Sequence, residues 1–400
     1  MGRTAIAVGA ALVLITINLR LAVGSVSPVL DDISATLGLS STAAGLLTTA
    51  PVLCFGLAAP LAPRLARRFG QEALLLLALA AVVAGLAIRI APSVVPLFAG
   101  TIVLGVGIAI GNVLLPSVIK RRFADPGLML GLFTMSLSVS AALAAAFTVP
   151  LEEGLGDWHW ALGFWALPAL VAIALWAPVV RSAERGPTPG GVPTAGLWRD
   201  RTAWLVTGAF GLQSLLFFSL LSWTPDILRD AGLSSGTAGA MLSLSMLCGI
   251  VPSLVLPVFM VRLRDQRWIV VPTTAAWAAG FVGLLLDPGG ATWVWMVLAG
   301  IGQGLGISFT LTLVVLRSAD PGTAAALSGM AQGVGYAIAA LGPFLLGAVE
   351  DATGAWDAPI AIMLAVTAGM LVCGYLAGCD RVVQGDRPRG DPPHPPHEGS

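Results

Sequence analysis

Long apolar segments separated by short polar stretches run along the whole chain, and this alternation is its dominant pattern. An α-helix needs about 20 mostly apolar residues to cross the hydrocarbon core of a bilayer. Twelve segments of about that length or longer lie near residues 4–30, 41–62, 71–91, 94–119, 127–149, 159–180, 202–224, 235–261, 268–286, 292–316, 323–349 and 358–379. The pattern predicts an all-α membrane protein with twelve transmembrane helices.

The second half of the chain repeats the first. The sequence Gly-Leu-Ser-Ser at residues 38–41 recurs at residues 232–235, and Ala-Asp-Pro-Gly at residues 124–127 recurs at residues 319–322. Each repeat holds six apolar segments, and an even number of spans inserts both halves in the same orientation. We therefore expect two parallel six-helix pseudo-repeats with a binding site at their interface, which is one of the plans of secondary transporters.

The composition supports this class and excludes others. Only 10% of the residues are charged and 56% are hydrophobic, whereas a soluble domain carries about 25% charged residues. The formal net charge of zero argues against a nucleic-acid partner. The four cysteines lack the spacing of metal ligands, so neither a metal site nor a disulfide framework is expected.

The basic residues predict the orientation in the membrane. With the N-terminus in the cytoplasm, all of the 21 Lys and Arg residues fall on the inner side except Arg20, Arg89 and Arg229. The carboxylates fall in or beside loops or in the tail, and none lies at mid-membrane. We therefore expect a multi-pass protein of the plasma or inner membrane with both termini cytoplasmic, and no proton carried by a core carboxylate.

Two stretches interrupt the apolar pattern. Residues 181–201 are rich in Gly, Pro and charge, which is typical of a linker, and the orientation puts them in the cytoplasm. Residues 384–400 are rich in Pro and Gly and are expected to form a disordered cytoplasmic tail. The predicted domains are thus an N-terminal half at residues 1–180 and a C-terminal half at residues 202–383.

Arg20 is the one charge inside an apolar span. A cation near the centre of a transmembrane helix costs about 2.5–3.5 kcal/mol on insertion scales, so Arg20 is expected to face protein or water. At 100° per residue it shares a polar and small face with Thr16, Gly24 and Ser27, whereas Asn18 points about 200° away. Arg20 either binds a ligand or has a structural role, bonded to helix-end carbonyls or a neighbouring amide.

Several other polar residues lie inside apolar spans. Asn18 and Asn112 are amides, Gln213 and Phe217 are four residues apart, and so are Gln332 and Tyr336, while Gln303 lies seven residues before Thr310. An amide and an aromatic ring on one helix face suit a small planar ligand, through a hydrogen bond and stacking. The alternative is that each amide bonds a neighbouring helix, for about 0.6 kcal/mol, and contacts no ligand.

Glycines recur at close spacing in the fourth, tenth and eleventh segments. They include Gly105, Gly107 and Gly111, then Gly302, Gly304 and Gly306, then Gly329 and Gly333. Although the first two sets superficially resemble dinucleotide-binding loops, they lie inside apolar helices and do not follow a strand. We expect them to let helix backbones approach closely.

The end of the second segment reads Pro-Leu-Ala-Pro63-Arg64-Leu-Ala-Arg67-Arg68-Phe-Gly. It resembles the inner loop between spans 2 and 3 of the major facilitator superfamily. That resemblance implies the major facilitator fold and makes Arg64, Arg67 and Arg68 candidates for gating at the inner loop. In the family pattern an Asp precedes the first Arg, and Pro63 stands there in this chain. An Asp-based gate is therefore in doubt, and a positive-inside role explains the three arginines equally well.

Three shorter stretches carry a narrower resemblance. They are Asn18-Leu19-Arg20, the stretch Gly-Asn-Val-Leu-Leu-Pro at residues 111–116, and residues 211–225, which begin Gly-Leu-Gln213 and end Trp-Thr-Pro. In these stretches the chain is similar to the cyanate and 2-nitroimidazole transporter (CynX/NimT) family. The resemblance implies a single-chain secondary transporter for a small polar or aromatic solute.

These observations lead to one functional hypothesis. The protein is expected to be a secondary active or facilitative transporter that moves a small, anionic or polar planar solute, similar to cyanate or a nitroimidazole, across the inner membrane by alternating access. The alternatives are a multidrug-type efflux transporter for small organic compounds and, in a different class, a membrane receptor or scaffold without transport.

Two further classes are not favoured. A membrane enzyme would need a reactive set of embedded side chains, and the sequence offers no embedded carboxylate, paired His or thiol–imidazole set. No Gly-x-x-x-x-Gly-Lys-Ser/Thr loop occurs, so ATP is not expected to supply the energy. We expect no catalytic residues and no cofactor, with a small-molecule substrate and the lipid bilayer as partners of a monomer.

Overall fold

The computed structural model describes residues 3–182 and 194–383. Within these ranges all regular structure is helical, and twelve spans are long and apolar enough to cross a membrane, as the hydropathy pattern predicts. In chain order the elements are α1 (Arg3–Gly24), the 3-10 turn η1 (Ser27–Val29), α2 (Leu30–Leu37), α3 (Ser41–Ala58), η2 (Ala59–Leu61), α4 (Ala62–Phe69), α5 (Gln71–Arg89), α6 (Val94–Arg122), α7 (Gly127–Leu155), α8 (Trp158–Phe164), α9 (Ala166–Ser182), α10 (Thr194–Leu197), α11 (Arg201–Asp230), α12 (Ser235–Cys248), α13 (Ile250–Met260), η3 (Arg267–Ile269), α14 (Val270–Leu286), α15 (Thr292–Leu316), α16 (Pro321–Thr353) and α17 (Asp357–Ala377).

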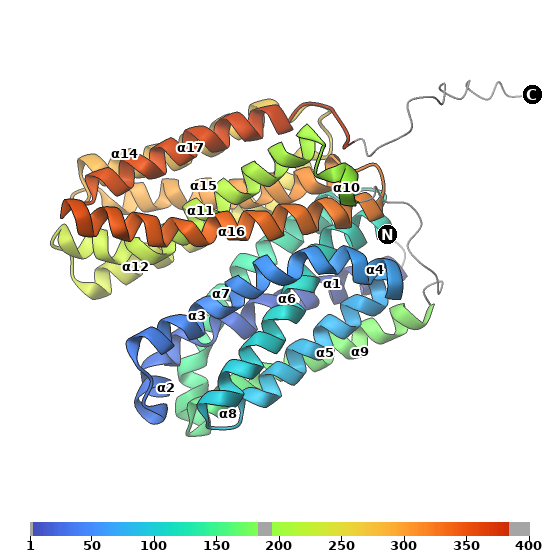
Figure 1. Ribbon diagram of the computed structural model, residues 1–400, viewed down its shortest axis with the longest axis horizontal. Coiled ribbons are helices and arrows are strands. Elements are labelled where there is room, and N and C mark those ends of the chain that lie inside the picture. Colours follow the sequence, from blue (N-terminus) through green and yellow to red (C-terminus); the bar gives the residue numbers. More distant parts are fainter. Residues whose placement is uncertain (1–2, 183–193, 384–400) are drawn as a thin grey trace, which may run out of the picture.

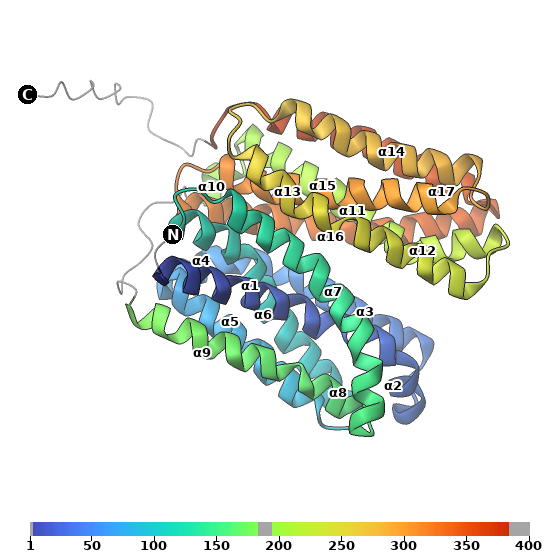
Figure 2. The same ribbon diagram turned by 180° about the vertical axis from the view of Figure 1, so that it is seen from behind.

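The helices form two groups that lie side by side. Figure 1 shows α1 to α9 in the lower group and α11 to α17 in the upper group, and the reverse view in Figure 2 shows the same separation. The first helix begins and the last one ends at the same end of the bundle. We call this end, which carries Lys120, Arg121 and Arg122, the basic end, and the opposite end, near α2, α8 and α12, the acidic end.

The two groups approach each other at the basic end and diverge towards the acidic end (Figures 1 and 2). Hydrogen bonds join them at the basic end, where Ser117 Oγ and Gln71 Nε2 both donate to the Pro321 carbonyl. Further bonds follow along the helices, from the Thr134 hydroxyl to the Ser253 carbonyl over 2.6 Å and from Gln332 to the Asn112 carbonyl over 3.1 Å. These bonds hold the basic end closed.

The first span is not one continuous helix. The sequence pattern predicts an uninterrupted segment at residues 4–30, but α1 ends at Gly24, and η1 and α2 continue the span to Leu37. Pro28 has no N–H to donate, and the Val26 N–H bonds the Val23 carbonyl instead of continuing the i→i−4 ladder. The break lies four residues beyond Arg20.

The glycine-rich segments bring helix backbones into direct contact, as their spacing predicts. A Cβ added to Gly304 would lie 2.1 Å from the Gly249 carbonyl oxygen, and one added to Gly107 would lie 2.6 Å from the Ala78 carbonyl oxygen. No side chain fits at such distances, so larger residues at these positions would force α15 away from its neighbours and α6 away from α5. These contacts confirm the packing role of the glycines.

Two buried networks of charged residues lie at the basic end, one in each half. Glu72, at the start of α5, is buried and binds both Arg121 at 3.1 Å and Arg122 at 2.9 Å. In the other half Arg317 is buried and donates to the carbonyls of Ala377 and Gly378, and this burial lowers the pKa of its guanidinium. Both networks fix the ends of helices that meet at the interface between the halves.

Candidate functional site

Arg20 and Tyr336 meet across the two halves. Arg20 is half-buried on α1, and its guanidinium lies near the Tyr336 hydroxyl on α16, close enough for the two groups to interact electrostatically. Among the described residues no carboxylate forms an ion pair with Arg20. A cation that is removed from water without a counter-charge is costly, so its position favours a negatively charged or strongly dipolar partner.

Aromatic rings surround the Tyr336 side chain. The centroids of Phe55 on α3 and Phe210 on α11 each lie 5.4 Å from that of Tyr336, and the centroid of Phe218 lies at 6.4 Å. These separations are typical of favourable edge-to-face and tilted aromatic pairs. We refer to Arg20, Tyr336, Phe55, Phe210 and Phe218 together as the Arg20–Tyr336 site.

The sequence analysis found only part of this site. Arg20 was recognisable as a charge within an apolar segment, and Tyr336 by its spacing from Gln332. The three phenylalanines were missed because they lie on two other helices, and a single sequence does not reveal which helix faces pack together. The sequence marks these three residues only as aromatic, a class that makes up 7% of the chain.

Gln332 and Asn112 lie next to the Arg20–Tyr336 site, one helical turn nearer the basic end along α16. The Gln332 side chain donates to the Asn112 carbonyl at 3.1 Å and to the Ser328 hydroxyl at 2.9 Å. The Asn112 Nδ2 atom is buried and has no hydrogen-bond partner among the described residues. The bond from Gln332 to Asn112 therefore brings both residues together at the interface between the halves.

Asn18 lies on another face of α1. Its Nδ2 donates to the Leu14 carbonyl at 2.7 Å, while its Oδ1 is buried without a partner in the described structure. Leu19, between Asn18 and Arg20, packs so tightly on α6 that a Cβ added to Gly111 would lie 3.0 Å from its Cδ2. No contact brings Asn18 to the Arg20–Tyr336 site.

Gln213 and Gln303 bond within the C-terminal half. The Gln213 Oε1 accepts from the Trp277 indole at 3.0 Å, and its Nε2 donates to the Gln303 carbonyl at 3.4 Å. The Gln303 Nε2 contacts the Met246 sulfur at 3.6 Å. Gln213 is therefore occupied by bonds that hold α11 to α14 and α15, which is the structural alternative considered for these amides.

Phe217 is also not in contact with Tyr336. Its ring is half-buried and packs on Phe218, with centroids 5.1 Å apart. Phe218 in turn lies next to Tyr336, so Phe217 adjoins the Arg20–Tyr336 site through this ring.

The three arginines of α4 lie at the surface of the basic end, where Arg68 lies over the ring of its neighbour Phe69 at 5.4 Å. Arg64, Arg67 and Arg68 are exposed, and none forms an ion pair among the residues that the structure describes. Pro63, in contrast, is buried against α16, where a Cβ added to Gly329 would lie 2.8 Å from its Cγ. At this position the halves meet by packing of Pro63 on glycine, which needs no ion pair.

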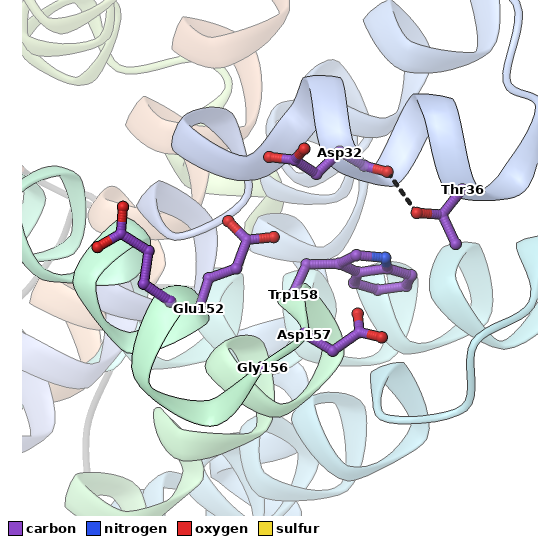
Figure 3. A pocket seen from close by; sticks show the side chains of 7 residues that line it. Asp32, Thr36, Glu152, Gly156, Asp157 and Trp158 are labelled. Carbon is purple, nitrogen blue, oxygen red and sulfur yellow. Dashed lines mark hydrogen bonds between the residues drawn. The ribbon is translucent and has the colours of Figure 1, made fainter.

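A separate pocket of about 420 Å³ opens at the acidic end. It is lined by Asp32, Thr36, Glu152, Glu153, Gly156, Asp157 and Trp158, and Figure 3 shows how α2 and the end of α7 bring Asp32 and Glu152 to it. No group of three or more potential metal ligands occurs among the described residues. Its four carboxylates give this pocket a negative charge, which disfavours the binding of an anion there.

Comparisons with known proteins identify relatives of the whole chain. The sequence matches the Major Facilitator Superfamily over residues 12–343. It is 41% identical to the uncharacterized transporter YycB of Bacillus subtilis, over 93% of each chain. It is 39% identical to the 2-nitroimidazole transporter of Escherichia coli, over 96% of this chain and 98% of the relative. Identity with the cyanate transport protein CynX of Escherichia coli is 31%, over 86% of this chain and 90% of the relative.

The fold is also that of solved transporters. The proton:xylose symporter XylE superposes with a TM-score of 0.77 over 95% of this chain and 98% of its own length, at 12% sequence identity. The all-α fold of twelve spans and the resemblance to the major facilitator superfamily and to the cyanate and 2-nitroimidazole transporters are thereby confirmed. The chain is a transporter and belongs to the major facilitator superfamily.

Proposed function

We propose that the protein transports a small planar anion, or a planar solute with a strong dipole such as a nitro group, and that the Arg20–Tyr336 site binds it. The observation that carries this proposal is the Arg20 cation, which has no ion-pair partner among the described residues and lies near the Tyr336 hydroxyl within a set of aromatic rings. The names of two relatives, a 2-nitroimidazole transporter and a cyanate transport protein, support the same class of solute.

The chemistry of the site suits this ligand. The guanidinium is planar and presents two parallel N–H groups, which match the two oxygens of a carboxylate or nitro group. The Tyr336 hydroxyl and the free Asn112 Nδ2 can donate further hydrogen bonds. Phe55, Phe210 and Phe218 offer ring faces and edges to the rest of a flat molecule. A solute bound in this way supplies the negative charge or dipole that compensates the positive charge of Arg20.

The position of the site supports alternating access. Arg20 and Phe55 belong to one half, whereas Tyr336, Phe210 and Phe218 belong to the other. The bonds between the halves lie between this site and the basic end, from Gln332 to Lys120. Rocking of the halves around a ligand that contacts both would exchange closure at the basic end for closure at the acidic end.

Ligand-dependent stabilisation of the purified protein tests the proposal. We expect benzoate, cyanate and 2-nitroimidazole to raise the melting temperature, and benzamide, a neutral planar control, to raise it less. At a ligand concentration of about 100 times Kd the stabilisation would be about 2.7 kcal/mol. Saturable benzoate uptake by proteoliposomes is the matching transport assay. If none of the three solutes shifts the melting temperature and no uptake occurs, the proposed substrate class is wrong.

The orientation also stays a proposal, with the basic end in the cytoplasm. Ser182→Cys at the basic end and Gly289→Cys at the acidic end are both exposed and tolerate a thiol, in a background without native cysteines. In intact cells we expect an impermeant maleimide to label Gly289→Cys only, and in inside-out vesicles Ser182→Cys only. Labelling of both from outside would contradict this orientation.

A further inference from the structure

Arg89 is a second cation buried within the helices. The positive-inside pattern assigned it to the outer side, next to a loop, but it ends α5 and its exposed fraction is 0%. Its Nη1 donates to the Ala22 carbonyl at 2.8 Å, and its Nε and Nη2 donate to the Thr101 hydroxyl oxygen at 3.1 and 2.8 Å. No carboxylate among the described residues forms an ion pair with it.

Thr101 is arranged to receive these bonds. Its own hydroxyl proton goes to the Leu97 carbonyl at 2.7 Å, so that the oxygen lone pairs face the guanidinium. The crossing of α5 and α6 is tight beside it, since a Cβ added to Gly100 would lie 2.5 Å from the Gly85 carbonyl oxygen and 2.9 Å from the Arg89 Cγ. The guanidinium is therefore held in one place by α6.

The hydrogen bond from Arg89 to the Ala22 carbonyl lies at the break in span 1. In an unbroken helix the Ala22 carbonyl would accept from the Val26 N–H, but that N–H bonds Val23. Apart from a long contact of 3.4 Å with the Ser25 hydroxyl, Arg89 provides the partner of this carbonyl. A cation at the C-terminal end of a helix is favoured by the helix dipole.

We propose that Arg89 is a positioning residue for substrate binding, which rests on the role proposed for Arg20. Ala22 lies two residues after Arg20, so the bond from Arg89 fixes the depth and rotation of the end of α1 that carries the binding cation. Gly24, at the same end of α1, packs closely on α7, because a Cβ added there would lie 3.0 Å from the Ala144 Cβ. Together α5, α6 and α7 hold the Arg20 guanidinium towards Tyr336.

The Thr101→Val variant tests this role, because it keeps the shape of the side chain and removes the oxygen that accepts two of the three bonds from Arg89. Thr101→Ser is the matched control, since it restores the hydroxyl. The readouts are KM for benzoate uptake by proteoliposomes and the maximal rate per folded transporter. We expect Thr101→Val to raise KM about tenfold, with the maximal rate within twofold of the parent, and Thr101→Ser to return KM to near the parent value.

Arg89→Lys gives an independent measurement, because lysine keeps the charge but cannot bond Ala22 and Thr101 in the same geometry. It should also raise KM by tenfold or more, whereas Arg229→Lys, at an exposed arginine paired with Asp226, should not. If KM is unchanged in Thr101→Val, or if only the yield of folded protein falls, Arg89 has no positioning role. If the parent itself shows no saturable uptake of benzoate, the proposed function fails as well.

Discussion

Arg20→Gln is expected to lower the affinity for benzoate by about 100-fold or more, while the protein still folds and inserts. A buried hydrogen bond to a charged group is worth about 1.5–3 kcal/mol, and the guanidinium can offer two of them to one carboxylate. Folding should suffer little because the substitution deletes a cation that has no ion-pair partner among the described residues. Calorimetric titration of the purified variant, with its melting temperature as the folding control, measures both effects.

Two companion variants separate the parts of this site. Arg20→Lys keeps the charge and loses the planar fork, so it should bind benzoate weakly, between the parent and Arg20→Gln. Tyr336→Phe keeps the ring that packs on Phe55 and Phe210 and removes one donor, so a loss of about tenfold is expected. Should Arg20→Gln unfold the protein, or bind benzoate as well as the parent does, Arg20 is a structural residue.

The fold could be predicted because it depends on properties that a single sequence displays. Segment length and hydropathy determine the number of spans, and the glycine spacing in α6 and α15 predicts close backbone contact. The break in span 1 was the exception. Residues 24–28, Gly-Ser-Val-Ser-Pro, interrupt the helix after Gly24, whereas the sequence analysis counted them within one segment at residues 4–30.

A site residue could be predicted from the sequence only where its charge or polarity stands out within its own apolar segment. Arg20 met that condition. Gln213 met it too, but Trp277 and the Gln303 carbonyl, on two other helices, take up its side chain. Arg89 was assigned to the outer side because it lies near the end of the apolar segment at residues 71–91, and its burial depends on Thr101 and Ala22 from α6 and α1. Such partners are a property of tertiary packing, which the order of residues along one helix does not reveal.

Lys120 adds two hydrogen bonds to those that join the halves at the basic end. Lys120, in the last turn of α6, donates from Nζ to the Val315 carbonyl at 2.6 Å and also to the Ser318 carbonyl. Both carbonyls belong to the C-terminal end of α15 and the residues that follow it, where backbone oxygens lack helical partners and a cation is favoured. Lys120 thus joins the halves through backbone dipoles, at an interface where no described ion pair crosses between them.

Lys120→Met is therefore expected to open the basic end. Methionine keeps most of the length of the side chain and removes both charge-assisted bonds, so the equilibrium between closed and open states should shift by about tenfold or more. Ala325, on α16, is buried against Ala59, Ala62 and Val113 of the other half, so a cysteine there reports opening. In a background without native cysteines, an impermeant maleimide applied from the basic side should label Ala325→Cys about ten times faster when Lys120 is methionine.

Arg121→Gln is the control, because Arg121 pairs with Glu72 inside its own half, and it should leave the labelling rate unchanged. Equal rates in the parent and in Lys120→Met would mean that packing alone, such as that of Pro63 on Gly329, keeps this end closed.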